Sequence, residues 1–101
     1  MKLVRENIAK RIYSEDPSTI TKPCNQDEYD LFLKLKLSEE LDELKQSKYT
    51  DISEYADVLE VLHTLMNVSG ISWEQVLEEK RRKANIEGSF SSGFIYKNNL
   101  K

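Results

Sequence analysis

Four acidic residues stand in two pairs with the same spacing, an acid followed three residues later by another acid. The first pair is Glu40 and Glu43 in SEELDEL, and the second is Glu54 and Asp57 in SEYADVL. On a helix, residues three positions apart share one face, with Cβ atoms about 5–6 Å apart. If two neighbouring helices turned these faces toward each other, the four like charges would repel one another unless cations lay between them. Such an oxygen-only ligand set favours magnesium, manganese or calcium over zinc, and the absence of an EF-hand loop motif disfavours calcium.

The apolar residues around the acids predict that both pairs lie beside a hydrophobic core. In the first helix, leucines recur with a 3.6-residue period, and Glu40 falls between Leu37 and Leu44 on that stripe. In the second helix, Glu54 leads an apolar row made of Val58, Val61, Leu65 and Val68. Glutamate and aspartate are almost never fully buried without a partner. An acid on such a stripe therefore requires a positively charged partner or a metal ion.

Both acidic pairs also have explanations that involve no metal. Asp51 followed by Glu54 has the spacing of a capping box at a helix N-terminus. Lys36 precedes Glu40 by one helical turn, which is the spacing of an ordinary ion pair on a solvent-facing side. Because the two acidic pairs occur on adjacent helices, each beside an apolar row, we favour a metal site over a solvated charged face.

Helices must position these acids, and the sequence predicts an all-α fold. The expected helices cover residues 3–13, 26–45, 51–68 and 73–86. The turn at 47–50 is short, so the two long acid-bearing helices should be antiparallel neighbours in a four-helix-type bundle. Helix 51–68 is apolar almost all round in its second half and is expected to be the most buried. Ser72 and Gln75 predict a capping box for the last helix, and the tail 88–101 is expected to be extended.

Composition narrows the class of protein further. The 101 residues suffice for one domain, 1–101, with a single core. A net charge of −3 gives no field that would recruit a nucleic acid polymer. No stretch approaches the roughly 20 apolar residues that span a membrane, and the start lacks the apolar run of a signal peptide. With Cys24 as the single cysteine, these features predict a soluble, cytoplasmic protein.

The first long helix carries more apolar side chains than one buried face requires. These side chains are Leu31, Phe32, Leu33, Leu35 and Leu37. Excess apolar surface on a small helical protein predicts a homo-oligomer, with part of this helix in the interface.

A magnesium site built on carboxylates points toward phosphate chemistry, because Mg²⁺ typically bridges protein acids to phosphate oxygens. Positively charged candidates for phosphate contacts are Lys2 and Arg5 at the start of the chain and Lys80 and Lys83 in the sequence KRRK. The KRRK sequence is equally explained by favourable charge near a helix C-terminus. His63 is the only histidine, and its apolar neighbours predict a core or interface residue rather than a metal ligand.

The acidic motifs and both ends of the chain together resemble a known enzyme family. LSEELDEL followed by SEYADVLEVLHTL is similar to the E-x-x-E and E-x-x-D signature of the MazG-like, all-α nucleoside triphosphate pyrophosphohydrolases. The opening KLVRENI and the later EEKRRKANIEGSF with GFIY resemble the phosphoribosyl-ATP pyrophosphohydrolase-like subgroup. Glu87 departs from that subgroup, which usually has a basic residue before the glycine. The resemblance covers nearly the whole chain.

The resemblance implies Mg²⁺-dependent cleavage of a nucleoside triphosphate between its α- and β-phosphates, with Mn²⁺ as a possible substitute. The implied metal ligands are Glu40, Glu43, Glu54 and Asp57, and Glu39 is implied as a further catalytic acid, either a ligand or a general base. Family members commonly assemble as dimers or tetramers, so a homodimer or homotetramer is expected. Two alternatives stay open: a phosphoribosyl-ATP pyrophosphohydrolase of histidine biosynthesis, and a non-enzymatic helical interaction module.

Overall fold

Helices make up all the regular structure of residues 1–97, the part of the chain that the computed structural model describes. In chain order they are α1 (Glu6–Glu15), a single 3-10 turn (Pro17–Thr19), α2 (Gln26–Gln46), α3 (Ile52–Val68) and α4 (Trp73–Glu87). The predicted all-α fold is therefore confirmed for these residues. Helix α1 begins at Glu6 rather than at Leu3, because Arg5 has an extended backbone. Within residues 1–97, no helix is long and apolar enough to cross a lipid bilayer.

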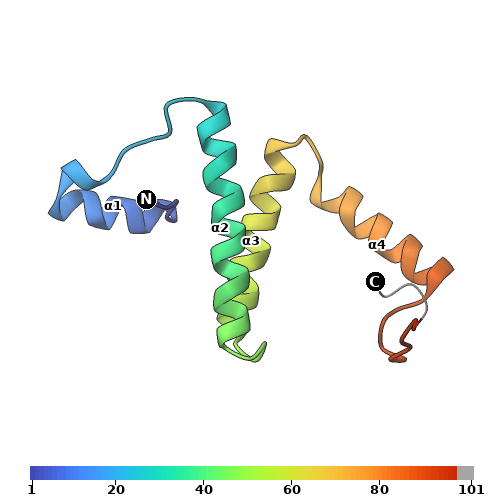
Figure 1. The fold of residues 1–101 in the computed structure, drawn as a ribbon. Coiled ribbons are helices and arrows are strands. Elements are labelled where there is room, and N and C mark those ends of the chain that lie inside the picture. The colour runs from blue at the N-terminus through green and yellow to red at the C-terminus, as the bar shows by residue number, and fades with distance from the viewer. Residues whose placement is uncertain (98–101) are drawn as a thin grey trace.

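Helices α2 and α3 pack side by side as an antiparallel hairpin (Figure 1). Asn25 caps the start of α2, where its side-chain oxygen accepts a hydrogen bond from the backbone N–H of Glu28 at 2.9 Å. The predicted short turn then reverses the chain, with Lys48 and Tyr49 both in the left-handed backbone region, at φ 57° and 61°. Non-glycine residues adopt this region infrequently. The hydroxyl of Tyr55 donates to the carbonyl oxygen of Tyr49 at 3.0 Å and so ties α3 to the turn.

Side-chain and glycine caps define both ends of α4. The predicted capping box is present: Ser72 Oγ accepts from the Gln75 N–H at 3.0 Å, and Gln75 Oε1 accepts from the Ser72 N–H at 2.8 Å. Gly88 ends the helix at φ 86°, a conformation that suits a residue without a Cβ. Residues 88–97 contain no helix or strand, and the rest of the predicted extended tail lies outside the described residues.

Helices α1 and α4 extend to opposite sides of the hairpin and leave most of it uncovered (Figure 1). Helix α1 contacts chiefly the turn Pro17–Thr19. Within residues 1–97, the only buried apolar side chains are Leu33, Leu44 and Val61, and none of them is fully buried. The prediction that helix 51–68 is the most buried is therefore wrong for the single chain: among residues 1–97, α2 has three buried residues and α3 has only Val61, because α2 is the helix that packs along α3. The described residues do not close into a four-helix bundle by themselves.

The chain exposes much more surface than a compact protein of its mass. Its accessible surface is 8915 Å², whereas a compact monomer of this size exposes roughly 5,900 Å². Its radius of gyration is 17.7 Å, against about 13 Å for a compact domain of this length. Large apolar side chains exposed on α2 and α3 include Leu31, Leu35, Leu41, Tyr55 and Leu59. A broad apolar surface therefore remains exposed on α2 and α3 of the single chain.

Candidate metal centre

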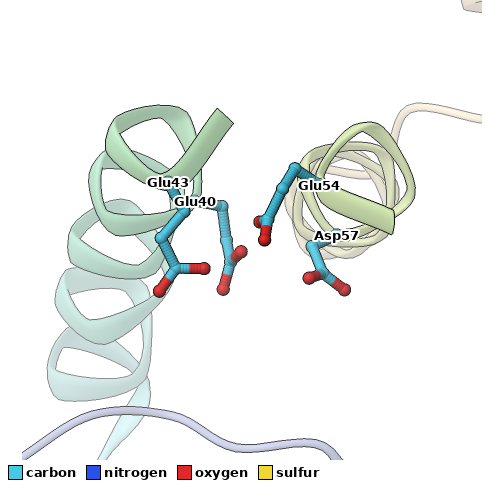
Figure 2. Close-up of side chains that lie close together, drawn as sticks. All are labelled: Glu40, Glu43, Glu54 and Asp57. Carbon is cyan, nitrogen blue, oxygen red and sulfur yellow. The ribbon is translucent and has the colours of Figure 1, made fainter. Parts of the chain in front are cut away.

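The four predicted metal ligands meet on the α2–α3 hairpin (Figure 2). Glu40 and Glu43 project from α2, and Glu54 and Asp57 project from α3 toward them. One carboxylate oxygen from each residue lies within 4.8 Å of those from the other three. Magnesium binds oxygens so that opposite ligands are about 4.2 Å apart. Small side-chain rotations would therefore let this acidic cluster, defined by these four residues, surround a divalent cation.

Two buried oxygens without partners indicate that the acidic cluster is suited to a cation. Glu40 is only 5% exposed. Its Oε1 lies 3.1 Å from Nζ of Lys36, whereas its Oε2 is buried and accepts no hydrogen bond among residues 1–97. Oε2 of Glu54 is also buried and unpartnered in this part of the chain. Leaving a buried acceptor unsatisfied costs about 1–3 kcal/mol, and more if it is charged. A metal ion among these oxygens would remove that cost at both residues.

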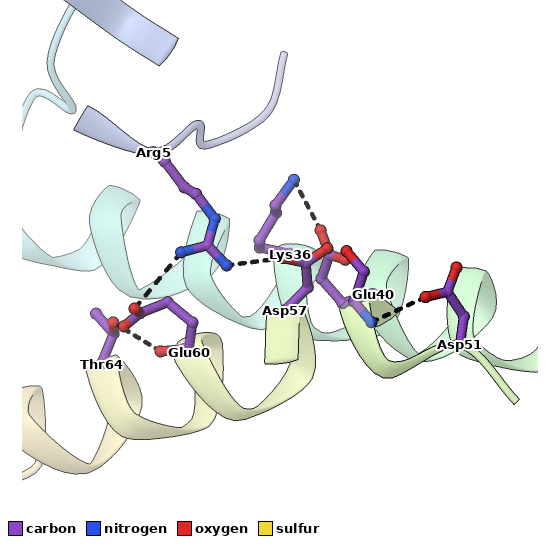
Figure 3. Close-up of polar contacts among 8 residues, drawn as sticks. Arg5, Lys36, Glu40, Asp51, Asp57, Glu60 and Thr64 are labelled. Atoms are coloured by element: carbon purple, nitrogen blue, oxygen red, sulfur yellow. Dashed lines mark hydrogen bonds and ion pairs between the residues drawn. The ribbon is translucent and has the colours of Figure 1, made fainter. Parts of the chain in front are cut away.

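Helix capping does not account for Glu54. Asp51 caps α3, since its carboxylate accepts a hydrogen bond from the backbone N–H of Ser53 at 2.8 Å (Figure 3). The reciprocal bond from the Asp51 backbone to the Glu54 side chain, which a capping box requires, is not formed. The side chain of Glu54 instead points toward Glu40 and Asp57 (Figure 2). Helix capping therefore explains Asp51 but does not explain Glu54.

Burial and neighbouring charge act together on Glu40. Its pKa is raised above the ordinary value chiefly by burial, with a further contribution from the charges of Glu43 and Asp57, and Lys36 opposes both. Glu39 shows the opposite balance, because hydrogen bonds from two lysines outweigh its burial and lower its pKa. A bound cation would favour the ionised form of Glu40, whereas Lys2 and Lys36 already favour the ionised form of Glu39.

The raised pKa of Glu40 predicts how stability depends on pH. Because the pKa lies above 4.5 in the folded chain, the folded state holds a proton that the unfolded state releases. The free energy of unfolding should therefore fall as the pH rises from 4.5 through the raised pKa. We expect wild type to be most stable relative to Glu40→Gln below this window and to lose that advantage above it. Urea unfolding in EDTA would measure the difference, and a difference that is constant between about pH 4 and pH 8 would contradict the shift.

Glu39, the fifth predicted acid, lies beside the cluster rather than in it. Its Oε1 is 3.3 Å from Nζ of Lys2, and its Oε2 is 3.3 Å from Nζ of Lys36. Two lysines thus hold Glu39 on the side of α2 that faces the start of the chain. This position suits a charged residue next to a metal-bound substrate better than it suits a metal ligand.

The four predicted phosphate contacts fall into two groups. Lys2 and Arg5 lie beside the acids, and Arg5 Nη2 is 2.7 Å from Oδ1 of Asp57 (Figure 3). Lys80 and Lys83 are exposed on α4, which extends away from the hairpin (Figure 1). The structure therefore brings the N-terminal pair to the acids and leaves the pair on α4 apart from them.

A cavity of about 770 Å³ lies between the N-terminal segment, residues 2–8, and the α2–α3 hairpin. Its charged lining includes Lys2, Arg5, Lys36, Glu40 and Asp57. Its apolar lining includes Leu3, Val4, Ile8, Leu33 and Val61. The volume falls in the range of small-ligand sites, which combine apolar walls with a few polar groups. The cavity joins two of the candidate metal ligands to three side chains that can bind phosphate.

Lys36 is the site residue that the sequence did not reveal. Its side chain is only 18% exposed and contacts both Glu39 and Glu40 while lining the cavity. Burial lowers its pKa, but hydrogen bonds to the two glutamates outweigh that effect, and the net shift is upward. Lys36 therefore remains charged beside the acids. The spacing to Glu40 was visible in the sequence, but it indicated only a surface ion pair and not a partly buried one.

His63 and Cys24 lie outside the acidic cluster. The predicted interface position of His63 stays a prediction, and the predicted core position is wrong for the single chain, because His63 is exposed, with its ring centroid 5.1 Å from that of Trp73. The cause is the same as for the rest of the outer face of α3, which α4 touches only at its start. Cys24 is exposed, and its thiol donates to Glu28 Oε2 at 3.2 Å, an interaction that raises its pKa. A raised thiol pKa disfavours a nucleophilic role.

No protein-family model, curated protein or solved structure matches this chain. The fold and the site define an all-α protein in which four acids from two antiparallel helices lie close enough together that they could hold a metal ion. The resemblance to the MazG-like hydrolases rests on the sequence motifs described above.

Proposed function

We propose that this chain is a Mg²⁺-dependent nucleoside triphosphate pyrophosphohydrolase that acts in nucleotide house-cleaning and releases a nucleoside monophosphate and pyrophosphate. The supporting observation is the convergence of the four acids, in which Glu40 and Glu54 each have a buried oxygen without a partner (Figure 2). The donor set is made only of carboxylate oxygens, which fits Mg²⁺, or Mn²⁺ in its place. The sequence motifs supply the reaction class.

The residues around the acidic cluster divide into metal ligands and phosphate contacts. Glu40, Glu43, Glu54 and Asp57 would hold the metal. A bound Mg²⁺ neutralises phosphate oxygens and lowers the pKa of an attacking water. Lys36 lies at the cavity wall beside the acids and is placed to pair with a phosphate oxygen, as is Lys2. Glu39, held ionised by these lysines beside the acidic cluster, is the candidate for a general base.

Pyrophosphate release from a panel of ribonucleoside and deoxyribonucleoside triphosphates, with phosphoribosyl-ATP included, tests this proposal. We expect release that requires Mg²⁺ or Mn²⁺ and stops in EDTA. A strong preference for phosphoribosyl-ATP would support the histidine-biosynthesis alternative. A non-enzymatic interaction module would release none, and Mg²⁺ would not raise its melting temperature, whereas a protein that binds the metal only when folded melts later as Mg²⁺ is added.

We also propose that the protein is a homodimer or homotetramer formed through the outer faces of α2 and α3. Leu31 and Leu35 on α2 are 54% and 53% exposed, and Leu59 on α3 is 49% exposed. The chain exposes roughly 3,000 Å² more than a compact monomer, which is more than one subunit contributes to most obligate interfaces. A second copy packed on the hairpin would cover these side chains and complete a bundle of helices.

The oligomer predicts a solution mass clearly above that of one chain. Light scattering at micromolar concentration should return a multiple of 11.8 kDa. Leu35→Glu should shift the mass toward the monomer, because it places a charge in the apolar interface. Lys80→Glu is the control, since Lys80 is exposed on α4, which extends away from the proposed interface on the hairpin (Figure 1). A wild-type mass near 11.8 kDa would contradict the prediction.

A further inference from the structure

We propose that the N-terminal segment, residues 2–8, is a latch over the acidic cluster in which Arg5 competes with a divalent cation for Asp57. The inference rests on the proposed metal site and adds to it a means of controlling access. Its basis is a set of contacts between the start of the chain and the hairpin, together with the place of this segment at the cavity wall.

Two side chains fasten the latch to the hairpin in the described part of the chain. Arg5 Nη2 donates to Asp57 Oδ1 at 2.7 Å, and Arg5 Nη1 lies 3.5 Å from Glu60 Oε1 (Figure 3). Lys2 Nζ lies 3.3 Å from Glu39 Oε1. Each contact is between a cation of the latch and an acid of α2 or α3. The attachment is therefore electrostatic and responds directly to any new positive charge at these acids.

Arg5 and Lys36 differ in how readily each can leave the acids. Lys36 is part of α2, is mostly buried, and stays next to Glu40 as long as the helix is intact. Arg5 is 53% exposed and lies on an extended segment that precedes α1. A divalent cation on the acidic cluster would repel both Arg5 and Lys36. It would also bind the Asp57 carboxylate, which accepts a hydrogen bond from Arg5 in this structure. Arg5 is the cation that such a metal would displace.

Release of Arg5 would open the cavity without unfolding the hairpin. Residues 2–8 line the cavity together with Glu40 and Asp57 of the hairpin. Helix α1 contacts mainly the turn Pro17–Thr19, so the latch can move while the packing of α2 on α3 is retained. The latch thus couples occupation of the acidic cluster to access through the cavity.

Titration with Mn²⁺, followed by the electron paramagnetic resonance of the free ion, tests the competition. Arg5→Gln removes the competing charge, so we expect it to bind Mn²⁺ roughly threefold to fivefold more tightly than wild type, as suits an exposed ion pair. Arg11→Gln is the matched control, because Arg11 is exposed, follows shortly in the chain, and makes no ion pair among residues 1–97. If Arg5→Gln and Arg11→Gln changed the Mn²⁺ affinity equally, the loss of one positive charge anywhere in this segment would explain the result, and the proposal would be overturned. Weaker binding by Arg5→Gln would also overturn it, since Arg5 would then position Asp57.

Hydrogen exchange measures the latch movement itself. In wild type, saturating Mg²⁺ should accelerate amide exchange in residues 9–12, whose N–H groups bond to carbonyl oxygens of the latch as Ala9 N–H does to Arg5 at 2.9 Å, whereas Arg5→Gln should exchange rapidly there with and without Mg²⁺. Unchanged exchange in wild type on saturation would overturn the latch. Tighter Mn²⁺ binding by Arg5→Gln in a protein that hydrolyses no nucleotide would uphold the latch and contradict the proposed function. Nucleotide hydrolysis together with equal Mn²⁺ affinity in wild type, Arg5→Gln and Arg11→Gln would support the proposed function and overturn the latch. If none of these three proteins bound Mn²⁺, both the latch and the proposed metal-dependent function would be overturned.

Discussion

Glu43→Gln and Asp57→Asn should each lower the rate of pyrophosphate release more than tenfold while the helices stay folded. The amides keep the shape of the acids but remove the charge that a hard cation requires. A tenfold loss corresponds to about 1.4 kcal/mol of transition-state stabilisation. The rate would be measured at saturating Mg²⁺, with far-ultraviolet circular dichroism to confirm the helices. A variant that kept more than about a tenth of the wild-type rate would contradict its role as a ligand.

Glu43 gives the cleaner of these two tests. Asp57 also accepts from Arg5, so Asp57→Asn changes the latch as well as the metal site. Glu43 makes no ion pair among residues 1–97, and its charge raises the pKa of Glu40. In EDTA, Glu43→Gln should therefore melt no lower than wild type, because it relieves like-charge repulsion. Asp42→Asn is the matched control, since it removes the same charge from an exposed neighbour outside the cluster and should leave the rate unchanged.

The acidic cluster was predictable because local rules fix every step that leads to it. The i,i+3 spacing places each pair on one helix face, and the short turn after α2 makes α3 its antiparallel neighbour. Glu40 on the leucine stripe then had to face α3, and the structure places it there, almost fully buried. Capping residues such as Ser72 and Gln75 likewise fixed helix ends through contacts only a few residues apart. Each of these inferences depended on short-range geometry.

The parts that could not be predicted depend on contacts between distant segments. The apolar faces of α3 indicate that something covers them, but periodicity does not distinguish helices of the same chain from a second copy. Arg5 meets Asp57 across more than half the chain, and no spacing rule connects them. Arg5 was predicted as a phosphate contact, and its pairing with an acid became visible only in three dimensions. The place of Lys36 in the cavity wall was hidden for the same reason, because residues 2–8, which are distant in the sequence, line the same cavity.

The environment of Glu40 follows partly from sequence spacing and partly from contacts seen only in three dimensions. The sequence predicts an acid on an apolar stripe and leaves two explanations open, an ion pair or a metal. In the structure both apply to the same side chain: Oε1 contacts Lys36, and Oε2 lies buried without a partner. A lysine alone therefore does not satisfy the carboxylate. Lys36 limits the rise in the pKa of Glu40, and a divalent cation beside the carboxylate would lower that pKa further.

Hydrolysis in ¹⁸O-labelled water is expected to place the label in the nucleoside monophosphate, because the proposed reaction has water attack the α-phosphorus. Pyrophosphate would then leave unlabelled, with its charge neutralised by the metal and by cations at the cavity wall such as Lys2 and Lys36. Removal of the γ-phosphate alone would call for a different phosphate cradle, typically a glycine-rich P-loop, and the motif G-x-x-x-x-G-K-[ST] does not occur in the sequence. Mass spectrometry of the products distinguishes these outcomes. Label in pyrophosphate or orthophosphate, or a nucleoside diphosphate product, would refute the assigned bond cleavage even if the reaction required Mg²⁺.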